Sequence, residues 1–210
     1  NYSESHENLH IKPFYMDRYE VSNFEYKEFV DANGYYNKEY WPSELMHKGI
    51  KISFNEVKTS FVDKSNFPSP KDWQQGAYEN GKDHFPVAGI SWYEAYAYAK
   101  FREKSLPSVA EWYYAFDRNR PNKALENANI NSYNFTKSRV ETSSVNHNGI
   151  YDMVGNVREW VYNNITDKNK KGILGGSFAD DPYLALDFYS QNAWDRNIYN
   201  GIRLVKKIEA

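Results

Sequence analysis

The chain has 210 residues, of which 40% are hydrophobic and 26% are charged, and its formal net charge is −2. This composition is typical of a folded protein with a core, and the near-neutral charge argues against binding to nucleic acid or to an anionic membrane. Cysteine is absent, which excludes disulfides, thiolate metal sites and cysteine nucleophiles within this chain.

The first predicted elements are a strand and a helix near the N-terminus. Apolar and polar residues alternate over Phe14–Val21, which predicts a strand. Directly after it, Ser22 and Glu25 have the spacing of a capping box, in which the serine oxygen accepts a hydrogen bond from an exposed backbone N–H and the glutamate bonds back to the serine. A helix is therefore expected to begin after Ser22, and Gly34 provides an end for it.

The same signature predicts two more helices in the middle of the chain. Ser91 with Glu94, and Ser108 with Glu111, repeat the Ser-x-x-Glu spacing. Each pair is followed by aromatic residues and small apolar residues at helical spacing. We therefore predict three short helices in all.

The remaining segments are predicted as long loops and short strands. Proline and glycine recur over residues 35–86, and we expect this segment and residues 118–148 to be mostly irregular. Long loops of this kind in a compact domain are usually functional or specially anchored. Toward the C-terminus, Gly172–Phe178 and Gly201–Lys207 have the composition of strands.

Aromatic residues make up 18% of the chain, with 19 tyrosines, 12 phenylalanines and 6 tryptophans. Two interpretations stay open: a tyrosine-rich binding face, or an irregular fold that packs large rings in its core, which we favour. No hydrophobic stretch is long enough to span a bilayer, so we expect no membrane insertion by this segment. The chain begins at Asn1 and no signal peptide opens it. We predict one α+β domain over residues 1–210, excised from a longer protein.

The segment GIYDMVGNVREWV, Gly149–Val161, is strongly apolar, yet it contains a turn signal and two charges. Asn156 and Glu159 offer an amide oxygen and a carboxylate beside the bend that Gly155 allows. Calcium takes about six to eight oxygen ligands in irregular geometry, so the segment could wrap around a cation. From the residues alone we favour a simpler interpretation, a turn followed by a surface pair of Arg158 and Glu159.

Other candidate metal ligands have weaker support. His6 and His10 have the H-x-x-x-H spacing that places two imidazoles on one metal when the segment is helical. Lys12 stands where a glutamate ligand would be expected, and Pro13 argues against a continuing helix. We do not favour a metal site at these histidines.

The C-terminal third contains a hydroxyl and two adjacent carboxylates. Gly175, Gly176 and Ser177 form a turn or bulge beside the serine, with no local base that would make it a nucleophile. Asp180 and Asp181 could bind a cation or act as acid and base, although adjacent carboxylates in a loop are more often solvated. Because G-x-S-x-G, P-loop and dinucleotide motifs are also absent, we predict no catalytic residues.

Five blocks of sequence occur in order along nearly the whole chain, from about Pro13 to Lys207. They are PFYMDRYEVSNFEYKEFV, FPVAGISWYEAYAYAKFREKSLPSVAEWYYA, NGIYDMVGNVREWV, LGGSF and NGIRLVKK. Together they closely resemble the sulfatase-modifying-factor family, also called the formylglycine-generating-enzyme-like family. The intervening segments Glu39–Trp41 and Trp73–Gly81 resemble a subgroup found as modules in larger bacterial proteins, some of which carry kinase or other signalling domains.

This resemblance implies a C-type-lectin-like fold, an α+β fold with low regular secondary structure, about three short helices, small antiparallel sheets and long loops. It also implies structural calcium, because the GN-x-x-EW block of the family helps to hold one calcium ion. By position, Asn156 and Glu159 would be the side-chain ligands, with nearby backbone carbonyls. The bend and the carboxylate would then interrupt the apolar segment because the chain wraps around a cation.

The activity of the family is implied less clearly than its fold. The founding enzyme oxidises a substrate cysteine to formylglycine with O₂ and with copper held by two cysteines, which follow the GGS block. Here those positions fall near Asp181 and Leu186, which cannot supply a soft Cu(I) site. We therefore expect no copper and no formylglycine generation. Related non-haem iron enzymes build much of their iron site from a separate helical domain, so we expect no such centre in this chain alone.

We therefore favour a non-catalytic ligand- or protein-binding module in a larger bacterial protein, with a peptide, a protein or a sugar as its ligand. Two alternatives stay open: a divergent metal-dependent enzyme of the formylglycine-generating and non-haem iron superfamily, and a structural domain of a secretion or motility lipoprotein. We expect an extracytoplasmic location, periplasmic or at the surface. The expected binding platform consists of aromatic, hydroxyl and charged residues, namely Trp160, Ser177, Phe178, Asp180, Asp181, Tyr183, Tyr189, Trp194 and Arg196.

Overall fold

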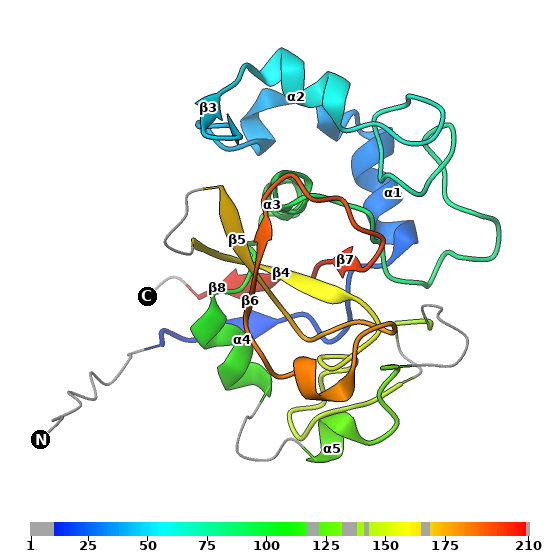
Figure 1. Ribbon diagram of the computed structural model, residues 1–210, viewed down its shortest axis with the longest axis vertical. Coiled ribbons are helices and arrows are strands. Elements are labelled where there is room, and N and C mark those ends of the chain that lie inside the picture. Colours follow the sequence, from blue (N-terminus) through cyan, green and yellow to red (C-terminus); the bar gives the residue numbers. More distant parts are fainter. Residues whose placement is uncertain (1–10, 117–121, 132–137, 141–142, 165–168, 209–210) are drawn as a thin grey trace, which may run out of the picture.

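A four-stranded sheet lies at the centre of the computed structural model, which describes residues 11–116, 122–131, 138–140, 143–164 and 169–208 (Figure 1). The strand order is β6-β5-β4-β7. Strand β5 pairs antiparallel with both β4 and β6, whereas β4 and β7 are parallel. The four strands are β4 (Arg158–Asn164), β5 (Lys170–Leu174), β6 (Tyr189–Asn192) and β7 (Asn200–Gly201).

Two smaller antiparallel sheets accompany the central one in the described part of the chain. The first and last strands, β1 and β8, lie side by side, with Phe14 opposite Lys207. Strands β2 and β3 form a short hairpin. These strands are β1 (Phe14–Met16), β2 (Met46–His47), β3 (Ile50–Lys51) and β8 (Val205–Lys207).

The three predicted helices are confirmed, and each begins at its capping box. They are α1 (Asn23–Asp31), α3 (Trp92–Phe101) and α4 (Val109–Phe116). In each box the serine Oγ accepts a hydrogen bond from the glutamate N–H at 3.2 Å. The glutamate carboxylate accepts the serine N–H at 2.7 to 2.8 Å. These local contacts define the helix starts independently of the rest of the fold.

Further helices lie in segments that the sequence pattern marks as irregular. Helix α2 (Phe54–Ser60) has the same kind of capping box, formed by Ser53 and Glu56, so its start carries the signal that identifies the other three. Helix α5 and three short 3-10 helices complete the set that the described residues form. They are α5 (Asn122–Leu125), η1 (Gly34–Tyr36), η2 (Lys38–Tyr40) and η3 (Pro182–Leu184). No helix in the described ranges is both long and apolar enough to cross a membrane.

The central sheet separates two apolar clusters. Trp160 and Ile173 pack into a larger cluster with α1 and α3, and the alternate residues Val161 and Leu174 pack into a smaller one with α4. Figure 1 shows α3 on one side of β4 and β5, and α4 on the other. Because full burial of one large apolar side chain contributes about 1.5–3 kcal/mol, these two clusters are the main stabilising feature of the fold.

Large rings fill the core, as the favoured interpretation of the composition predicts. Tyr26, Phe29, Tyr35 and Tyr98 are each at most 1% exposed. The rings of Tyr26 and Tyr98 stack with centroids 4.9 Å apart, and Phe29 meets Tyr98 edge-on at 5.9 Å. Such arrangements let aromatic side chains fill a core between short elements.

Two predicted strands end earlier than expected. Of Phe14–Val21, only the three residues of β1 form a strand. Of Gly172–Phe178, the strand stops at Leu174, because Gly175 and Gly176 have φ values of +91° and +68° and turn the chain. The sequence pattern therefore overestimates strand length wherever a turn follows an apolar run.

The predicted strand Gly201–Lys207 is split between β7 and β8. Between them, the carbonyls of Ile202 and Leu204 accept hydrogen bonds from the N–H groups of Val21 and Asp17, each at 3.0 Å. The chain thus crosses from the central sheet to the pair formed by β1 and β8. Residues 17–21 lie alongside this crossing segment and are hydrogen-bonded to it.

Candidate functional site

The apolar segment before β4 is interrupted by a turn that joins three parts of the chain. Gly155 and Asn156 have φ values of +83° and +57°. A Cβ on Gly155 would lie 2.4 Å from the carbonyl oxygen of Asn129, so only glycine fits there. The Asn156 N–H donates to the same oxygen at 2.7 Å, and the Gly155 N–H donates to Gly175 at 2.8 Å. Strand β4 begins two residues later, so the segment contains both the turn and the strand that its composition suggests.

The side chains of the two predicted calcium ligands are buried and have separate partners. Asn156 donates from Nδ2 to Glu20 Oε2 at 2.6 Å, and its Oδ1 accepts the Ser138 N–H at 2.8 Å. Glu159 Oε2 accepts the indole N–H of Trp112 at 2.6 Å, and Glu159 Oε1 accepts from Arg203 Nε at 2.9 Å. Asn156 is 0% exposed and Glu159 is 1% exposed.

This arrangement does not fit a calcium ion held by Asn156 and Glu159. A calcium ligand turns its oxygen toward the ion, whereas here the oxygens of both side chains accept hydrogen bonds from protein donors. The guanidinium of Arg203 takes the place that a cation beside Glu159 would take. Among the residues that the structure describes, no group of three or more histidine, aspartate or glutamate side chains could hold a metal ion. Calcium stays a prediction for this region.

Two further carboxylates lie beside this pair, and the sequence analysis does not identify them. Glu20 and Asp152 are each 1% exposed, and with Glu159 they form what we call the carboxylate cluster. Arg203, which is 0% exposed, is the guanidinium that interacts with all three. Three carboxylates around one guanidinium leave an excess of negative charge in the interior, which must be neutralised by protons or by a cation.

Asp152 interacts with Arg203 through charge. Within the described residues, neither of its oxygens accepts a hydrogen bond of normal geometry, although the nearby Ser143 hydroxyl and the charge of Arg203 lower the pKa of the carboxyl. Burial outweighs this effect and raises the pKa of Asp152 to about 7. Burial also raises the pKa of Glu20, and the charge of Asp152 raises it further. The oxygens of Asp152 are therefore better placed to accept a cation than those of Asn156.

A second polar group lies where the chain turns after β5. Arg158, on β4, forms a bidentate ion pair with Asp180: Nε donates to Oδ2 at 2.8 Å and Nη2 donates to Oδ1 at 2.5 Å. The hydroxyl of Ser177 also donates to Asp180 Oδ2, at 2.9 Å. Although burial opposes it, the hydrogen bonds and charge of Arg158 hold the pKa of Asp180 below its ordinary value. Ser177 is therefore a buried support of this ion pair, and the carboxylate that it contacts is a weak base because its pKa is lowered.

Aromatic rings pack on one side of this ion pair. The Arg158 guanidinium lies 5.7 Å from the ring centroid of Tyr199, which in turn packs edge-on against Phe178 at 5.2 Å. The hydroxyl of Tyr189 is buried without a hydrogen bond in the described structure, and burial and the charges of Asp187 and Asp180 raise its pKa. We call the set of Arg158, Ser177, Phe178, Asp180, Asp181, Tyr183, Tyr189 and Tyr199 the Asp180 surface.

Exposure within the Asp180 surface is concentrated on η3. Tyr183 is 73% exposed, and Asp181 beside it is also exposed. Phe178 is only 4% exposed and Ser177 is 0% exposed, so both support the surface from below. The structure thus brings together six of the nine predicted binding residues.

Two predicted platform residues belong to the larger apolar cluster instead. Trp160 is 0% exposed and its indole N–H donates to the Ile90 carbonyl at 3.0 Å, so it cannot contact a ligand at the surface. Trp194 stacks on the His47 ring with centroids 4.2 Å apart, and its indole N–H donates to the Met46 carbonyl at 2.5 Å. These two tryptophans support the core and the β2–β3 hairpin, and they do not form one platform with η3.

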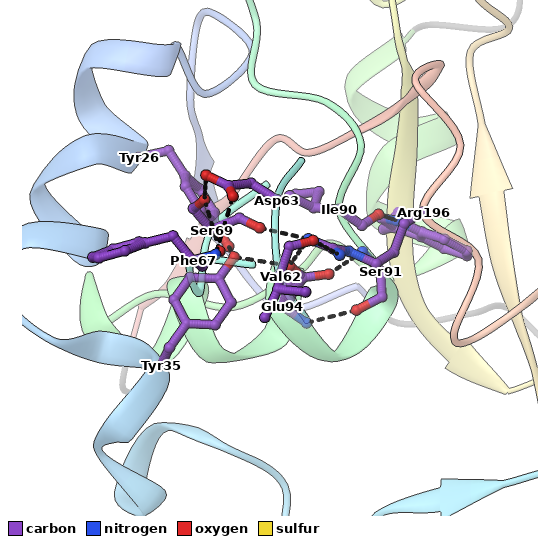
Figure 2. Close-up of polar contacts among 11 residues, drawn as sticks. Tyr26, Tyr35, Val62, Asp63, Phe67, Ser69, Ile90, Ser91, Glu94 and Arg196 are labelled. Atoms are coloured by element: carbon purple, nitrogen blue, oxygen red, sulfur yellow. Dashed lines mark hydrogen bonds and ion pairs between the residues drawn. The ribbon is translucent and has the colours of Figure 1, made fainter. Parts of the chain in front are cut away.

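Arg196, also predicted in the platform, lies in a buried network beside α3 (Figure 2). Its Nη2 donates to Glu94 Oε1 at 2.9 Å and to the Ser69 carbonyl at 2.6 Å, and its Nη1 donates to the Val62 carbonyl at 2.7 Å. The Tyr35 hydroxyl donates to the same glutamate oxygen at 2.8 Å. Arg196 therefore connects the C-terminal loop to α3 and to the loop around residues 62–69.

That loop is held by a second buried carboxylate in the same view (Figure 2). Asp63 accepts hydrogen bonds from the N–H groups of Ser65, Phe67 and Gly76 at 2.7, 3.0 and 2.8 Å, and from the Ser69 hydroxyl at 3.0 Å. Burial opposes the charged form, but these four donors lower the pKa of Asp63. The loop of residues 62–76 is thus anchored by specific polar contacts rather than by regular structure.

The histidine pair cannot be placed, because His6 and His10 lie outside the described residues. Asp181 and Leu186, which fall near the cysteine positions of the founding enzyme, do lie within them. Asp181 is exposed at the start of η3, and Leu186 packs against the smaller apolar cluster. The carbonyl of Leu186 accepts the hydroxyl of Tyr113 at 3.1 Å.

Comparison with known sequences identifies relatives along the chain. The family model described as "Sulfatase-modifying factor enzyme 1-like domain" matches residues 2–208. The formylglycine-generating enzyme of Mus musculus is 29% identical over 183 residues, which cover 71% of this chain and 49% of that protein. The "Inactive C-alpha-formylglycine-generating enzyme 2" of Bos taurus is 25% identical, covering 81% of this chain and 67% of that protein.

A kinase is also among the relatives. The serine/threonine-protein kinase pkn1 of Chlamydia caviae is 26% identical, covering 72% of this chain but only 23% of the kinase. The chain spans about half the length of the first formylglycine-generating enzymes that it matches, 49% and 48%.

Solved structures show the same fold at low sequence identity. The structure of CarF superposes with a TM-score of 0.65 and 18% identity, covering 96% of this chain and 89% of that one. PvdO from Pseudomonas aeruginosa gives a TM-score of 0.65 with 20% identity, covering 94% and 81%. These likenesses confirm the fold class expected from the sequence motifs.

Proposed function

The chain belongs to the sulfatase-modifying factor enzyme 1-like family, and we propose that it is a non-catalytic member that binds a ligand as one module of a larger bacterial protein. The observation that carries this proposal is the absence of cysteine from a chain whose resemblance implies a copper site built from two cysteines. Soft Cu(I) requires soft ligands, and neither Asp181 nor Leu186 provides one.

The surroundings of these two positions support the proposal. Leu186 is packed against the smaller apolar cluster, so this position contributes to packing rather than to a metal site. Asp180, next to Asp181, has both oxygens occupied by Arg158. This ion pair disfavours a hard-metal enzyme that uses Asp180 and Asp181, because the first carboxylate would have to leave its guanidinium to bind the metal.

The relatives support the proposal in two ways. One of them is described as an inactive formylglycine-generating enzyme, so a homologue without that activity is known. In the kinase of Chlamydia caviae, the matching region is less than a quarter of the protein. A domain of this kind can therefore be carried as one module beside others.

The Asp180 surface is the proposed binding site, with a peptide, a protein or a sugar as its ligand. Tyr183 presents a largely exposed ring on η3, and Asp181 offers a carboxylate beside it. Rings that keep a polar group at one end are favoured at binding surfaces, because they bury much area with few rotatable bonds. Underneath, the ion pair between Arg158 and Asp180 fixes the backbone that carries these two side chains.

The absence of formylglycine-generating activity is the first expected result. When the protein is incubated with a peptide that contains the C-x-P-x-R motif, O₂ and Cu(I), no aldehyde should form above a control without protein, because the chain has no thiolate to hold copper. Mass spectrometry of the peptide measures the product, and an active formylglycine-generating enzyme serves as the positive control. Aldehyde above the protein-free control would contradict the proposal.

Loss of ligand binding in Tyr183→Ala is the second expected result. Ligands are first selected with the wild-type protein from a displayed peptide library and a glycan array. The variant should bind them roughly tenfold more weakly, because exposed aromatic anchors carry much of the affinity of such surfaces. Tyr36→Ala is a matched control, since Tyr36 is 54% exposed and also lies on a 3-10 helix, beside α1. Equal binding by both variants would place the binding site elsewhere, and a selection without any ligand would count against a binding module.

A further inference from the structure

A separate cavity of about 240 Å³ opens at the C-terminal end of α3, between residues 104–108, β4 and β8. Ala99 and Leu106, each 2% exposed, form its apolar floor. The rings of Tyr96 and Tyr162 line its side. Its lining shares no residue with the Asp180 surface or the carboxylate cluster, so its ligand would be independent of the proposed function.

The walls of this cavity are fixed by backbone hydrogen bonds. Ser105 and Val205 exchange two N–H···O bonds, each at 2.9 Å, which tie one wall to β8. The Tyr162 N–H donates to the Pro107 carbonyl at 2.8 Å, which ties the same wall to β4. A ligand would therefore find a preformed site and would not need to order these segments.

Positive charge dominates the lining. Lys100, Lys104 and Lys207 all line the cavity, and no carboxylate does. Asp17 pairs with Lys104 at 2.5 Å, and Glu111 pairs with Lys207, but both carboxylates lie outside the lining. These pairs hold two ammonium groups in place and offset part of their charge, so the three lysines and two carboxylates leave an excess of one positive charge at the cavity.

The size and chemistry of the cavity define the class of ligand. Its volume of about 240 Å³ lies just below the range of roughly 300–1,000 Å³ that is common for ligand pockets, so the ligand is small. The floor suits a flat apolar body, and the lysines suit a carboxylate, sulfonate or phosphate group. We propose that this cavity binds a small anionic molecule whose aromatic or apolar body lies on Leu106 and whose anionic group lies between Lys100 and Lys207.

The test uses the full chain and three probes that separate the two parts of the ligand. Benzenesulfonate has both the ring and the charge, benzyl alcohol has only the ring, and inorganic sulfate has only the charge. Titration followed by heteronuclear NMR should show saturable binding of benzenesulfonate, with shifts centred on the Ser105 and Leu106 amides. Its affinity should exceed that of either other probe roughly tenfold. Equal affinities for all three probes, or shifts centred elsewhere, would overturn the proposal.

Variants test the same assignment. Lys100→Gln combined with Tyr162→Ala should weaken benzenesulfonate binding roughly tenfold, and both side chains are exposed, so the fold should persist. Lys206→Gln is the matched control, because Lys206 is exposed on β8 opposite Tyr15 and does not line the cavity. If the melting temperature of the double variant is lower than that of wild type, the affinity of the single variant Lys100→Gln is used as the test instead. Unchanged affinity in the deciding variant, or an equal loss in Lys206→Gln, would refute the site.

Discussion

Replacing Arg203 with alanine is expected to lower the free energy of unfolding by about 3–5 kcal/mol, a large part of the stability of an ordinary domain. Arg203 is 0% exposed and pairs with Glu159, which is 1% exposed. Its guanidinium also donates to the carbonyls of Asp17 and Tyr151, at 3.1 and 2.6 Å. Without it, the carboxylate cluster keeps three acidic groups with no buried cation beside them among the described residues, and two carbonyls lose their donor.

Urea unfolding followed by circular dichroism measures this effect. Arg102→Ala is the control, because Arg102 pairs with Glu28 at the surface and removal of an exposed pair costs about 0–1 kcal/mol. A double variant, Arg203→Met with Glu159→Gln, should recover part of the loss, since it removes a buried charge together with its partner. If Arg203→Ala is no less stable than Arg102→Ala, the ion pair does not have the structural role assigned to it.

Replacing Asp152 with asparagine is expected to stabilise the metal-free protein near neutral pH and to reduce the dependence of its stability on pH. Burial raises the pKa of Asp152 to about 7, from an ordinary value near 3.8. Below the lower value the carboxyl is protonated in both the folded and the unfolded chain. Between the two values the unfolded chain releases a proton that the folded chain keeps, so rising pH favours unfolding.

The wild type should therefore lose stability relative to Asp152→Asn by up to about 1.4 kcal/mol per pH unit as the pH rises from about 4 to about 7. Denaturant titrations across this range, in the presence of EDTA, measure the difference between the two proteins. Asp63 and Asp180 have lowered pKa values, so they make stability rise with pH. Both proteins contain them, so the difference in stability between the two proteins excludes their contribution. Parallel pH profiles for both proteins would contradict the assigned burial effect.

A separate experiment tests whether calcium binds at Asp152. A calcium ion bound through Asp152, with backbone carbonyls and water, would hold the carboxyl ionised and remove the loss of stability at neutral pH. Elemental analysis before and after EDTA, with a thermal melt in each state, detects it in the wild type. About one calcium per chain, absent in Asp152→Asn, would support the family's calcium at this cluster. No metal and no effect of EDTA would leave protons as the neutralising species.

Local sequence determines the parts of the fold that could be predicted. The capping boxes at Ser22, Ser91 and Ser108 are each complete within four residues, so they identify helix starts without any knowledge of the fold. The box at Ser53 is equally complete, but it lies in a segment rich in proline and glycine, and that background hides it. Strand lengths depend on the pairing partner as well as on local pattern, which explains why the prediction extends them too far.

Contacts between distant residues determine the parts that could not be predicted. The carboxylate cluster and its arginine come from residues 20, 152, 159 and 203, and no local pattern brings these four together. Glutamate is usually a surface residue, but Glu159 lies on β4 of the central sheet and its side chain points into the interior. Trp194 and Arg196 lie close in sequence to Tyr189, yet after β6 the ring of Trp194 packs on His47 and the guanidinium of Arg196 pairs with Glu94 on α3.

The pairing of β1 with β8 would have a mechanical consequence if the chain is one module of a larger protein, as proposed. The chain enters at Phe14 and leaves at Lys207, and these two residues lie directly opposite each other in an antiparallel pair. A pulling force transmitted through the neighbouring chain would load the hydrogen bonds of this pair one after another, as in opening a zipper, instead of all at once in shear. The terminal strands would separate at low force, while the central sheet and its two apolar clusters remain folded.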